Sequence, residues 1–266
     1  MKVVAGPWVG EFGWELFCWQ AYIRAMSKAF NFTDVVCVTR PGRELLYEDF
    51  AIVKTLKTIP NQGACMHSCQ GYSFKEFISS YSEEYPNHKL ILPFNHWYHG
   101  RSVNINGQQV TADFNVLGQN TKNNQYPVIL HARSRELRSS DNWSRENWNT
   151  LSSNLFNEGI SFAFIGSKEE SLFIEGGVDL RGVPLRELVG YLAGAKCIVG
   201  PSSGPMHLAT LCKCPQVVWS GNDYNEIRYK REWNPFETSV SYLGNEYGGW
   251  HPNPETVYRK IIELLC

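Results

Sequence analysis

Hydrophobic and polar residues alternate along the first half of the chain in blocks that predict strands and helices in turn. Apolar runs at residues 2–6, 34–39 and 89–94 are short and continuous, which is typical of strands covered on both faces. Between the first two runs, apolar residues recur every three or four positions over residues 14–30, and this spacing indicates an amphipathic helix. A second helix is expected over residues 41–56.

The second half of the chain repeats this alternation more regularly. Its apolar runs predict strands at 127–132, 160–166, 196–200 and 215–219, and its helical spacing predicts helices at 144–159, 184–195, 205–212 and 254–266. Strands that alternate with helices build parallel sheets. We therefore predict an α/β protein of two Rossmann-like lobes, each a parallel sheet with flanking helices, and a cleft between the lobes.

The stretch from residue 100 to residue 126 interrupts the alternation. It is polar, rich in Asn and Gln, and without helical period, although it has room for a pair of β-strands. The lobe boundary is therefore expected near its end, giving lobes at 1–124 and 125–266. The final helix is expected to pack either on the second lobe or back on the first.

Composition narrows the class of protein. The chain has 266 residues, 43% of them hydrophobic and 19% charged, which suits two soluble lobes. The formal net charge of −1 argues against a large surface that neutralises nucleic-acid phosphates. No apolar run approaches the roughly 20 residues that span a bilayer, and no signal peptide is visible. We expect a cytoplasmic protein without a membrane span.

The cysteines do not predict a metal site. Eight cysteines without a secretion signal are expected to be reduced thiols. Cys65, His67 and Cys69 could be combined with Cys212 and Cys214, but their spacing is not that of a zinc site. The chain also lacks an Asp-x-Asp pair and a P-loop.

The segment IVGPSSGPMHLATL, residues 198–211, has the composition of a phosphate-binding turn. It follows a predicted strand and opens a predicted helix, and Pro205 suits the first helical position. The free N–H groups and positive dipole end of such a helix favour an anion. The expected ligand-binding residues are Ser202, Ser203, Gly204, Pro205, Met206 and His207. The alternative is a capped turn without a ligand.

These residues resemble a motif of the ADP-heptose:lipopolysaccharide heptosyltransferase family, whose members are glycosyltransferases of the GT-B fold. The family motif reads roughly G-x-D-S-G-P-x-H-L-A, and residues 200–209 here read GPSSGPMHLA. Upstream, Trp143, Glu146 and Trp148 match a W-P-x-E-x-W motif, and FAFIGSKEE and DLRGVPLRELVGYLAGAKCIVG match two further family segments.

The resemblance implies a donor site for a nucleoside-diphosphate sugar in the second lobe, with Gly166, Ser167 and Lys168 as a further phosphate turn. Two positions depart from the family. Its aspartate, implied to contact the donor sugar, is Ser202 here, and a lysine implied to neutralise phosphate is Asp141.

Arginines near Asp141 are candidates to replace the missing lysine. A guanidinium can grip a diphosphate with two hydrogen bonds. The candidates are Arg133, Arg135 and Arg138, with solvated loop charges as the alternative.

The later segment SGNDYNEIRYKREWNPF, residues 220–236, either closes over the nucleotide base or only connects to the last helix.

In the first lobe, Glu11 occupies the position where the family has an acidic residue implied to act as general base. A sugar hydroxyl needs such a carboxylate because it is a poor nucleophile until its proton is being removed. Glu15 is a second candidate, and a loop ion pair is the alternative for Glu11. The acceptor is expected to contact Trp8, Phe12, His96, Trp97, His99 and Arg101.

A rival interpretation comes from the same glycines. Gly6, Gly10 and Gly13 form a loose dinucleotide fingerprint, but the next strand ends at Thr39 and Arg40 instead of an acidic residue for ribose. NAD is therefore disfavoured, and no cofactor is expected.

Taken together, the sequence predicts a metal-independent, inverting, GT-B-like glycosyltransferase that uses a nucleoside-diphosphate sugar and a saccharide acceptor. Two alternatives stay open. One is a glycosyltransferase that acts on a hydroxymethylated base of DNA, and the other is a non-catalytic protein that binds nucleotide sugars.

Overall fold

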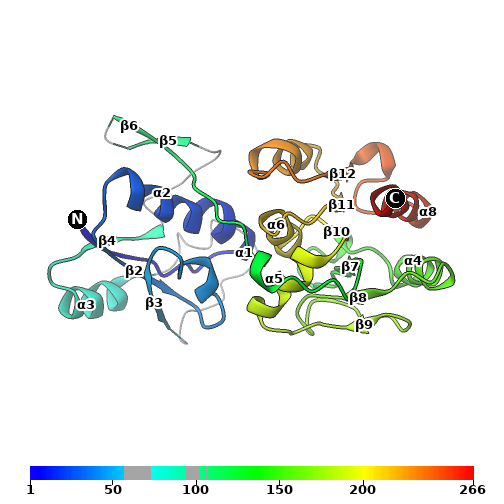
Figure 1. Ribbon diagram of the computed structural model, residues 1–266, viewed down its shortest axis with the longest axis horizontal. Helices are drawn as coiled ribbons and strands as arrows, with labels where there is room; N and C mark the ends of the chain where they lie inside the picture. Colours follow the sequence, from blue (N-terminus) through cyan, green and yellow to red (C-terminus); the bar gives the residue numbers. More distant parts are fainter. Residues whose placement is uncertain (57–72, 94–101, 106) are drawn as a thin grey trace. The chain divides into compact units, whose positions relative to one another are not determined.

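The computed structural model describes residues 1–56, 73–93, 102–105 and 107–266. Its chain forms two compact units, Met1–Asn115 and Val116–Cys266 (Figure 1). Each unit contains a parallel sheet with flanking helices, so the predicted α/β class is confirmed.

The first unit is built on a sheet of four parallel strands in the order β3-β2-β1-β4. The strands are β1 (Lys2–Ala5), β2 (Asp34–Thr39), β3 (Ile52–Thr55) and β4 (Lys89–Ile91). Strand order reverses between β1 and β4, because β2 and β3 extend the sheet on one side of β1 and β4 pairs on the other. Segments that follow β1 and β4 therefore start at neighbouring strand ends.

Two helical regions and a strand pair complete the first unit. A continuous helical segment comprises α1 (Phe12–Trp14), a π-helical part (Glu15–Gln20) and α2 (Ala21–Ala29), which confirms the helix predicted over 14–30. Helix α3 (Lys75–Glu84) was not predicted. The strand pair anticipated within 100–126 is present as antiparallel β5 (Ser102–Ile105) and β6 (Gln108–Thr111).

The helix predicted over residues 41–56 is wrong. Only Glu44–Leu46 forms a short 3-10 helix, and the end of the segment is strand β3. Gly42, with φ of +86°, turns the chain at the start of the segment. At its end, β-branched Ile, Val and Thr residues favour the extended edge of the sheet.

The second unit contains six parallel strands in the order β12-β11-β10-β7-β8-β9. The strands are β7 (Val128–Leu130), β8 (Phe162–Phe164), β9 (Val178–Asp179), β10 (Cys197–Pro201), β11 (Gln216–Trp219) and β12 (Val240–Leu243). This is the doubly wound order of nucleotide-binding α/β sheets, and it reverses between β7 and β10. The short strands β9 and β12 were not predicted.

The helices of the second unit cover both faces of its sheet. They are α4 (Arg145–Asn157), α5 (Leu185–Gly194), α6 (Gly204–Leu211), α7 (Tyr224–Ile227) and α8 (Pro254–Leu265). Helices α4 and α8 lie on one face, and α5 and α6 lie on the other (Figure 1). Helix α4 begins where the Ser144 hydroxyl accepts a hydrogen bond from the Asn147 N–H at 3.2 Å, and Gly159 with φ of +69° follows its end.

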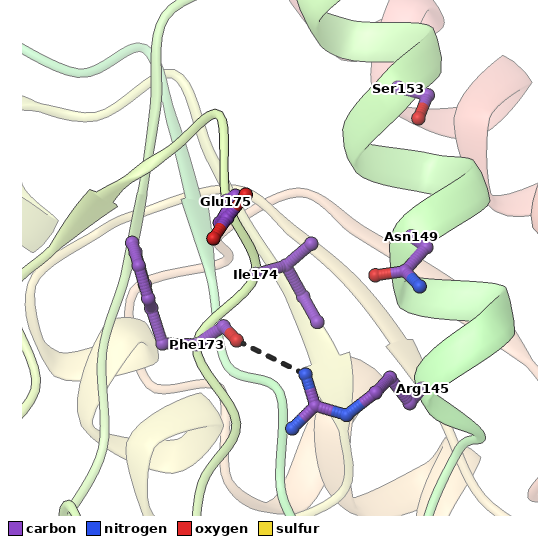
Figure 2. A pocket seen from close by; sticks show the side chains of 6 residues that line it. All are labelled: Arg145, Asn149, Ser153, Phe173, Ile174 and Glu175. Atoms are coloured by element: carbon purple, nitrogen blue, oxygen red, sulfur yellow. Dashed lines mark hydrogen bonds between the residues drawn. The ribbon is translucent and has the colours of Figure 1, made fainter.

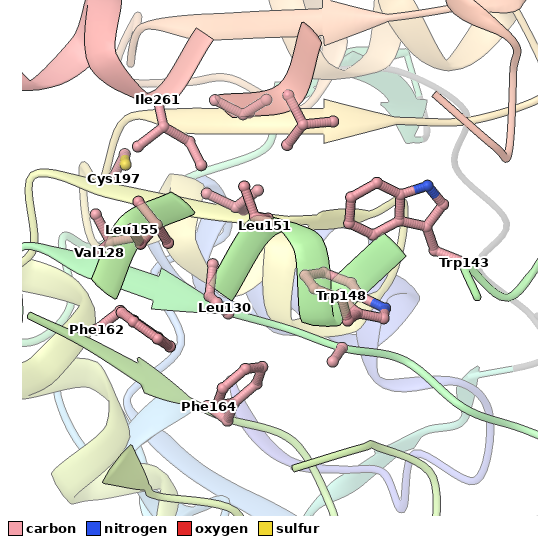
Figure 3. Close-up of a cluster of buried hydrophobic side chains, with 14 of the residues drawn as sticks. Val128, Leu130, Trp143, Trp148, Leu151, Leu155, Phe162, Phe164, Cys197 and Ile261 are labelled. Atoms are coloured by element: carbon pink, nitrogen blue, oxygen red, sulfur yellow. The ribbon is translucent and has the colours of Figure 1, made fainter. Parts of the chain in front are cut away.

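Three tryptophans belong to the hydrophobic core that packs against α4 and α8 (Figure 3). Trp143, Trp148 and Trp219 are each at most 1% exposed, with ring centroids 4.7–5.7 Å apart. The two tryptophans of the predicted W-x-x-E-x-W motif are thus core residues. Ile261 of α8 belongs to the same cluster, so the final helix packs within the second unit.

The chain before β7 also packs on the second unit. The Leu117 N–H donates to the Leu211 carbonyl at 2.9 Å, and the Asn123 N–H donates to the Gly190 carbonyl at 3.0 Å. These bonds explain why the units divide between Asn115 and Val116, whereas the predicted boundary lay between 124 and 125. Within the described ranges, no helix has both the length and the apolar character needed to cross a membrane.

Replacing Gly190 by Ala will destabilise the second unit. Ala is the better helix former, but a Cβ at Gly190 would run into the Thr121 carbonyl oxygen. We expect a loss of about 1–3 kcal/mol, measured by urea unfolding. Asn149→Ala, on the exposed face of α4, is the control and should change stability by less than about 0.5 kcal/mol. A higher unfolding midpoint for Gly190→Ala would contradict the packing argument.

Candidate functional site

Three loops meet at the carboxyl edge of the second sheet. They follow β10, β7 and β8, which are adjacent strands on either side of the strand-order reversal. Ligands of open α/β sheets bind at this position. The loop after β10 with the start of α6 contains the predicted residues 202–207, the loop after β7 contains Arg133, Arg135 and Arg138, and the loop after β8 contains residues 166–168. The topology thus brings together segments that were singled out separately in the sequence.

The loop after β10 leads directly into α6. Ser203 is the N-cap residue and Pro205 lies in the first turn, as predicted. Residues 202–205 are half-exposed. The Ser203 hydroxyl donates to the Pro201 carbonyl at 2.9 Å, so its proton is used within the loop. The Ser203 N–H and carbonyl are also paired within the chain, with Tyr229 and with the His207 N–H, so Ser203, predicted to bind a ligand, can offer it only the lone pairs of its hydroxyl.

An aromatic cluster lies behind this loop. His207 stacks on Tyr229 with ring centroids 4.7 Å apart and meets Trp233 edge-on at 4.7 Å. The Tyr229 hydroxyl lies 3.3 Å from His207 Nε2 and 3.2 Å from the Ser202 hydroxyl, and it accepts a hydrogen bond from the Ser203 N–H at 3.3 Å. The segment 220–236 thus supports the loop directly instead of only connecting to the last helix.

Burial keeps two histidines of this edge neutral. Burial, together with the smaller effect of the Arg228 charge, lowers the pKa of His207 from 6.5 to about 3. Burial also lowers the pKa of His131, which follows β7, to about 4. His131 Nδ1 lies 3.3 Å from the Ile165 carbonyl oxygen, which ties the end of β7 to the end of β8.

Arg133 holds the loops together. Its side chain is 4% exposed, and its guanidinium donates to the carbonyls of Ser202 at 3.0 Å and Asp141 at 2.5 Å. The guanidinium also lies 4.9 Å from the ring centroid of Trp250. These contacts make Arg133 a fixed positive charge that orients the Ser202 carbonyl.

The other two predicted arginines differ in their surroundings. Arg135 forms an ion pair with Asp141 at 3.3 Å, so the carboxylate that replaces the expected lysine pairs within the loop. Arg138 has a left-handed backbone with φ of +57°. It is exposed, so its side chain is open to solvent. Of the three arginines, Arg138 is the most available to an incoming ligand.

The turn after β8 requires its glycine. Gly166 has φ of +127°, and a Cβ there would overlap the Ser171 side chain. Ser167 and Lys168 are exposed, and the Ser167 hydroxyl accepts a hydrogen bond from the Glu170 N–H at 3.0 Å. The turn therefore offers one solvated cation at this edge.

In the first unit, Glu11 follows β1 at the reversal of strand order and is half-buried. Its carbonyl accepts hydrogen bonds from the Glu15 N–H at 3.1 Å and from the Trp8 indole N–H at 3.0 Å. Trp8 is only 3% exposed and stacks on Trp19. The prediction that Trp8 contacts an acceptor is therefore corrected: its indole anchors the turn from within the core.

Glu15, the second candidate base, is fully buried. Its carboxylate accepts hydrogen bonds from the hydroxyls of Tyr47 at 2.8 Å and Thr39 at 3.2 Å, and it forms an ion pair with Arg43. Burial and the Glu15 charge raise the pKa of Tyr47 well above its usual value. Glu15 thus anchors the helix start, and Arg43 also lies 4.9 Å from the ring centroid of half-buried Phe12.

The remaining acceptor predictions, His96, Trp97, His99 and Arg101, lie outside the described residues, as do Cys65, His67 and Cys69. Among the residues that are described, no group of three or more His, Cys, Asp and Glu side chains is placed to hold a metal ion.

A hollow of about 420 Å³ lies between α4 and the segment 173–175 (Figure 2). None of the predicted ligand-binding residues lines this hollow.

Tyr229, Trp233 and Trp250 are site residues that sequence reasoning did not single out individually. Each is distant in sequence from the loop it supports, and no local spacing marks it. For Tyr229 and Trp233, the available signal was the density of aromatic and basic residues in segment 220–236, and Trp250 lies outside that segment.

Comparison with known families confirms the resemblance predicted from the sequence. Residues 98–228 match the model of glycosyltransferase family 9 (heptosyltransferase). This segment contains all three loops at the carboxyl edge of the second sheet. No curated protein sequence matches the chain.

Solved structures show the same fold. ADP-heptose lipopolysaccharide heptosyltransferase II from E. coli has a TM-score of 0.63 at 15% identity, covering 100% of this chain and 98% of that chain. A family 9 glycosyl transferase from Veillonella parvula has a TM-score of 0.59 at 10% identity, covering 99% and 96%. E. coli heptosyltransferase WaaC with ADP has a TM-score of 0.58 at 13% identity, covering 99% and 100%.

The stability of the second unit will fall with acidification below about pH 6.5. His131 and His207 have lowered pKa values in the folded chain, so the unfolded chain binds more protons between pH 6.5 and their folded values. Their contribution is complete above pH 6.5 and is lost as the pH falls towards 4 and 3. Between pH 6.5 and about pH 5, the protonation of each histidine lowers the free energy of unfolding by up to about 2 kcal/mol.

The measurement is the urea midpoint as a function of pH. His207→Gln should flatten the decline, whereas His251→Gln, at an exposed histidine, should leave it unchanged. An unaltered decline in His207→Gln would contradict a neutral buried His207.

Proposed function

We propose that this chain, a glycosyltransferase whose residues 98–228 match family 9, transfers a sugar from a nucleoside-diphosphate sugar to a hydroxyl acceptor. The reaction inverts the anomeric centre and uses no metal ion. One observation carries the proposal: the three segments predicted to bind the donor follow adjacent strands β10, β7 and β8 at the strand-order reversal.

The donor diphosphate binds at the start of α6. The first N–H groups of a helix have no partner within the helix, and Gly204 and Met206 supply two of them. The Ser202 hydroxyl and the exposed Arg138 and Lys168 add further donors. These groups stabilise the charge that develops on the diphosphate as it leaves, where the largest part of the rate enhancement is expected.

Glu11 acts as the general base. Its carboxylate accepts the proton of the acceptor hydroxyl while that oxygen bonds to the anomeric carbon. The bond from the anomeric carbon to the phosphate oxygen breaks, and its electron pair leaves with the diphosphate. The two hydrogen bonds to the Glu11 carbonyl hold the residue at the turn after β1.

A saccharide is the proposed acceptor, in keeping with the family match. The absence of an Asp-x-Asp pair supports metal independence, because that motif is the usual ligand of a metal-bound diphosphate. ADP is the first nucleotide to test, since one structure with this fold contains it. GDP, UDP and CDP complete the set.

Gly204→Pro will weaken binding of the tightest of these nucleotides. Proline is tolerated at the first helical position, so the substitution removes one N–H donor while keeping the helix. A lost hydrogen bond to a charged group corresponds to about 10- to 100-fold weaker binding. Isothermal titration calorimetry measures the change, with thermal melting to check the fold.

Gly204→Ala is the matched control, because it adds a side chain but keeps the N–H. Equal affinities for the Pro and Ala variants would contradict a phosphate held by this amide. Failure of the unmutated protein to bind any of the four nucleotides would remove the proposed donor site altogether.

Glu11→Gln will lower kcat by about 10²- to 10⁴-fold and leave nucleotide affinity unchanged, because an amide cannot accept the proton. Turnover is measured after a thermal-shift screen of nucleotide sugars has identified a donor. Glu158→Gln, at an exposed carboxylate that follows α4 in the second unit, is the control. Unchanged kcat in Glu11→Gln would refute the base assignment.

If the unmutated protein binds a nucleotide sugar but shows no turnover with any saccharide, the non-catalytic alternative is favoured.

A further inference from the structure

We propose that Tyr229 is a positioning residue that makes the Ser202 hydroxyl a hydrogen-bond donor to an oxygen of the bound nucleotide sugar. The proposal rests on the proposed function, since it concerns the same site. Tyr229 lies one residue beyond the segment 98–228 that matches the family model, and it is completely buried. The role of Tyr229 is therefore inferred from its own contacts and not from the family match.

The peptide between Ser202 and Ser203 is clamped from both sides. A trans peptide directs its carbonyl and its N–H in opposite directions. Arg133 donates to the Ser202 carbonyl at 3.0 Å, and the Tyr229 hydroxyl accepts from the Ser203 N–H at 3.3 Å. Arg133 and Tyr229 thus determine how this peptide, and the serine before it, face the ligand.

The hydrogen-bonding capacity of Tyr229 couples Ser202 to His207. A phenol has one proton to donate and two lone pairs to accept with, and the Ser203 N–H occupies one lone pair. Two neighbours remain, Ser202 Oγ at 3.2 Å and His207 Nε2 at 3.3 Å. Because the phenol has a single proton, only one of them can accept it, and the other can pair with Tyr229 only by donating to the second lone pair.

The two arrangements present opposite chemistry to the ligand. If His207 Nε2 accepts from Tyr229, the proton of Ser202 is directed at Tyr229, and only lone pairs face the ligand. If His207 carries its proton on Nε2 and donates, Tyr229 donates to Ser202 instead. The Ser202 proton is then free to point at the ligand.

The second arrangement suits an anionic ligand at the start of α6. The Ser203 hydroxyl already donates to the Pro201 carbonyl at 2.9 Å, so Ser202 supplies the hydroxyl proton of this loop. An oxygen of the diphosphate or of the sugar accepts that proton, whereas outward lone pairs would repel it. Burial of His207 keeps the imidazole neutral, so the tautomer on Nε2 does not depend on pH near neutrality.

This arrangement also changes what the site selects. The motif that the chain resembles has an aspartate at position 202, and an ionised carboxylate only accepts hydrogen bonds. Ser202 supported by Tyr229 donates instead. The site therefore favours a donor sugar or phosphate oxygen that accepts a hydrogen bond at this point.

A double-mutant cycle tests the coupling. Ser202→Ala, Tyr229→Phe and the double variant are titrated with the tightest-binding of ADP, GDP, UDP and CDP. We expect each single variant to bind about tenfold more weakly and the double variant to bind no more weakly than either, because both remove the same hydrogen bond. Effects that multiply independently, or single variants that bind like the unmutated protein, would overturn the proposal.

Histidine NMR reads the tautomer directly and does not need a nucleotide. In protein with ¹⁵N-labelled histidine, the His207 signal, identified by its loss in His207→Gln, should show protonation at Nε2 in both free and bound protein. Protonation at Nδ1 in either would overturn the proposal.

A conservative pair separates this role from simple packing. His207→Gln places an amide N–H near the position of Nε2 and should retain affinity within about threefold, whereas the shorter His207→Asn should lose about tenfold. Equal losses in both would contradict a donor at this position. If no nucleotide binds the unmutated protein, the proposed function fails, while the NMR result still decides the tautomer.

Discussion

The order of strands in the second sheet is the constraint on which the rest of the site depends. Because the order reverses between β7 and β10, the loops that follow these strands diverge and leave their ends accessible at the carboxyl edge. The loop after β8 joins them as the next neighbour. Residues that lie far apart in sequence, such as Arg133 and Ser202, can then form a direct hydrogen bond.

Buried polar groups then set the shape of each loop. Arg133 and Tyr229 hold the peptide between Ser202 and Ser203 from opposite sides, and in the first unit Glu15 holds the start of its long helical segment with three donors. A buried charge or hydroxyl without partners would be costly. These contacts define the conformations of the loops, in which Ser202 and Glu11 are half-exposed.

Several residues have roles that differ from those their motifs suggested. Trp143 and Trp148 match a family motif but are core residues, and Trp8 anchors a turn from within the core. Asp141 replaces an expected lysine and pairs with Arg135. Matches to a motif therefore combine residues that build the fold with residues that face a ligand, and burial distinguishes the two.

The sequence by itself determined the α/β class, most helices and strands, and the turn before α6, because these depend on short-range periodicity and on the conformational preferences of Gly and Pro. It misassigned residues 41–56, where pairing with β2 outweighed local helical spacing. Only the tertiary structure decided that Arg133 bonds to Ser202 and that Tyr229 meets His207 and Ser203. Such contacts join residues brought together by sheet order, and no local pattern records them.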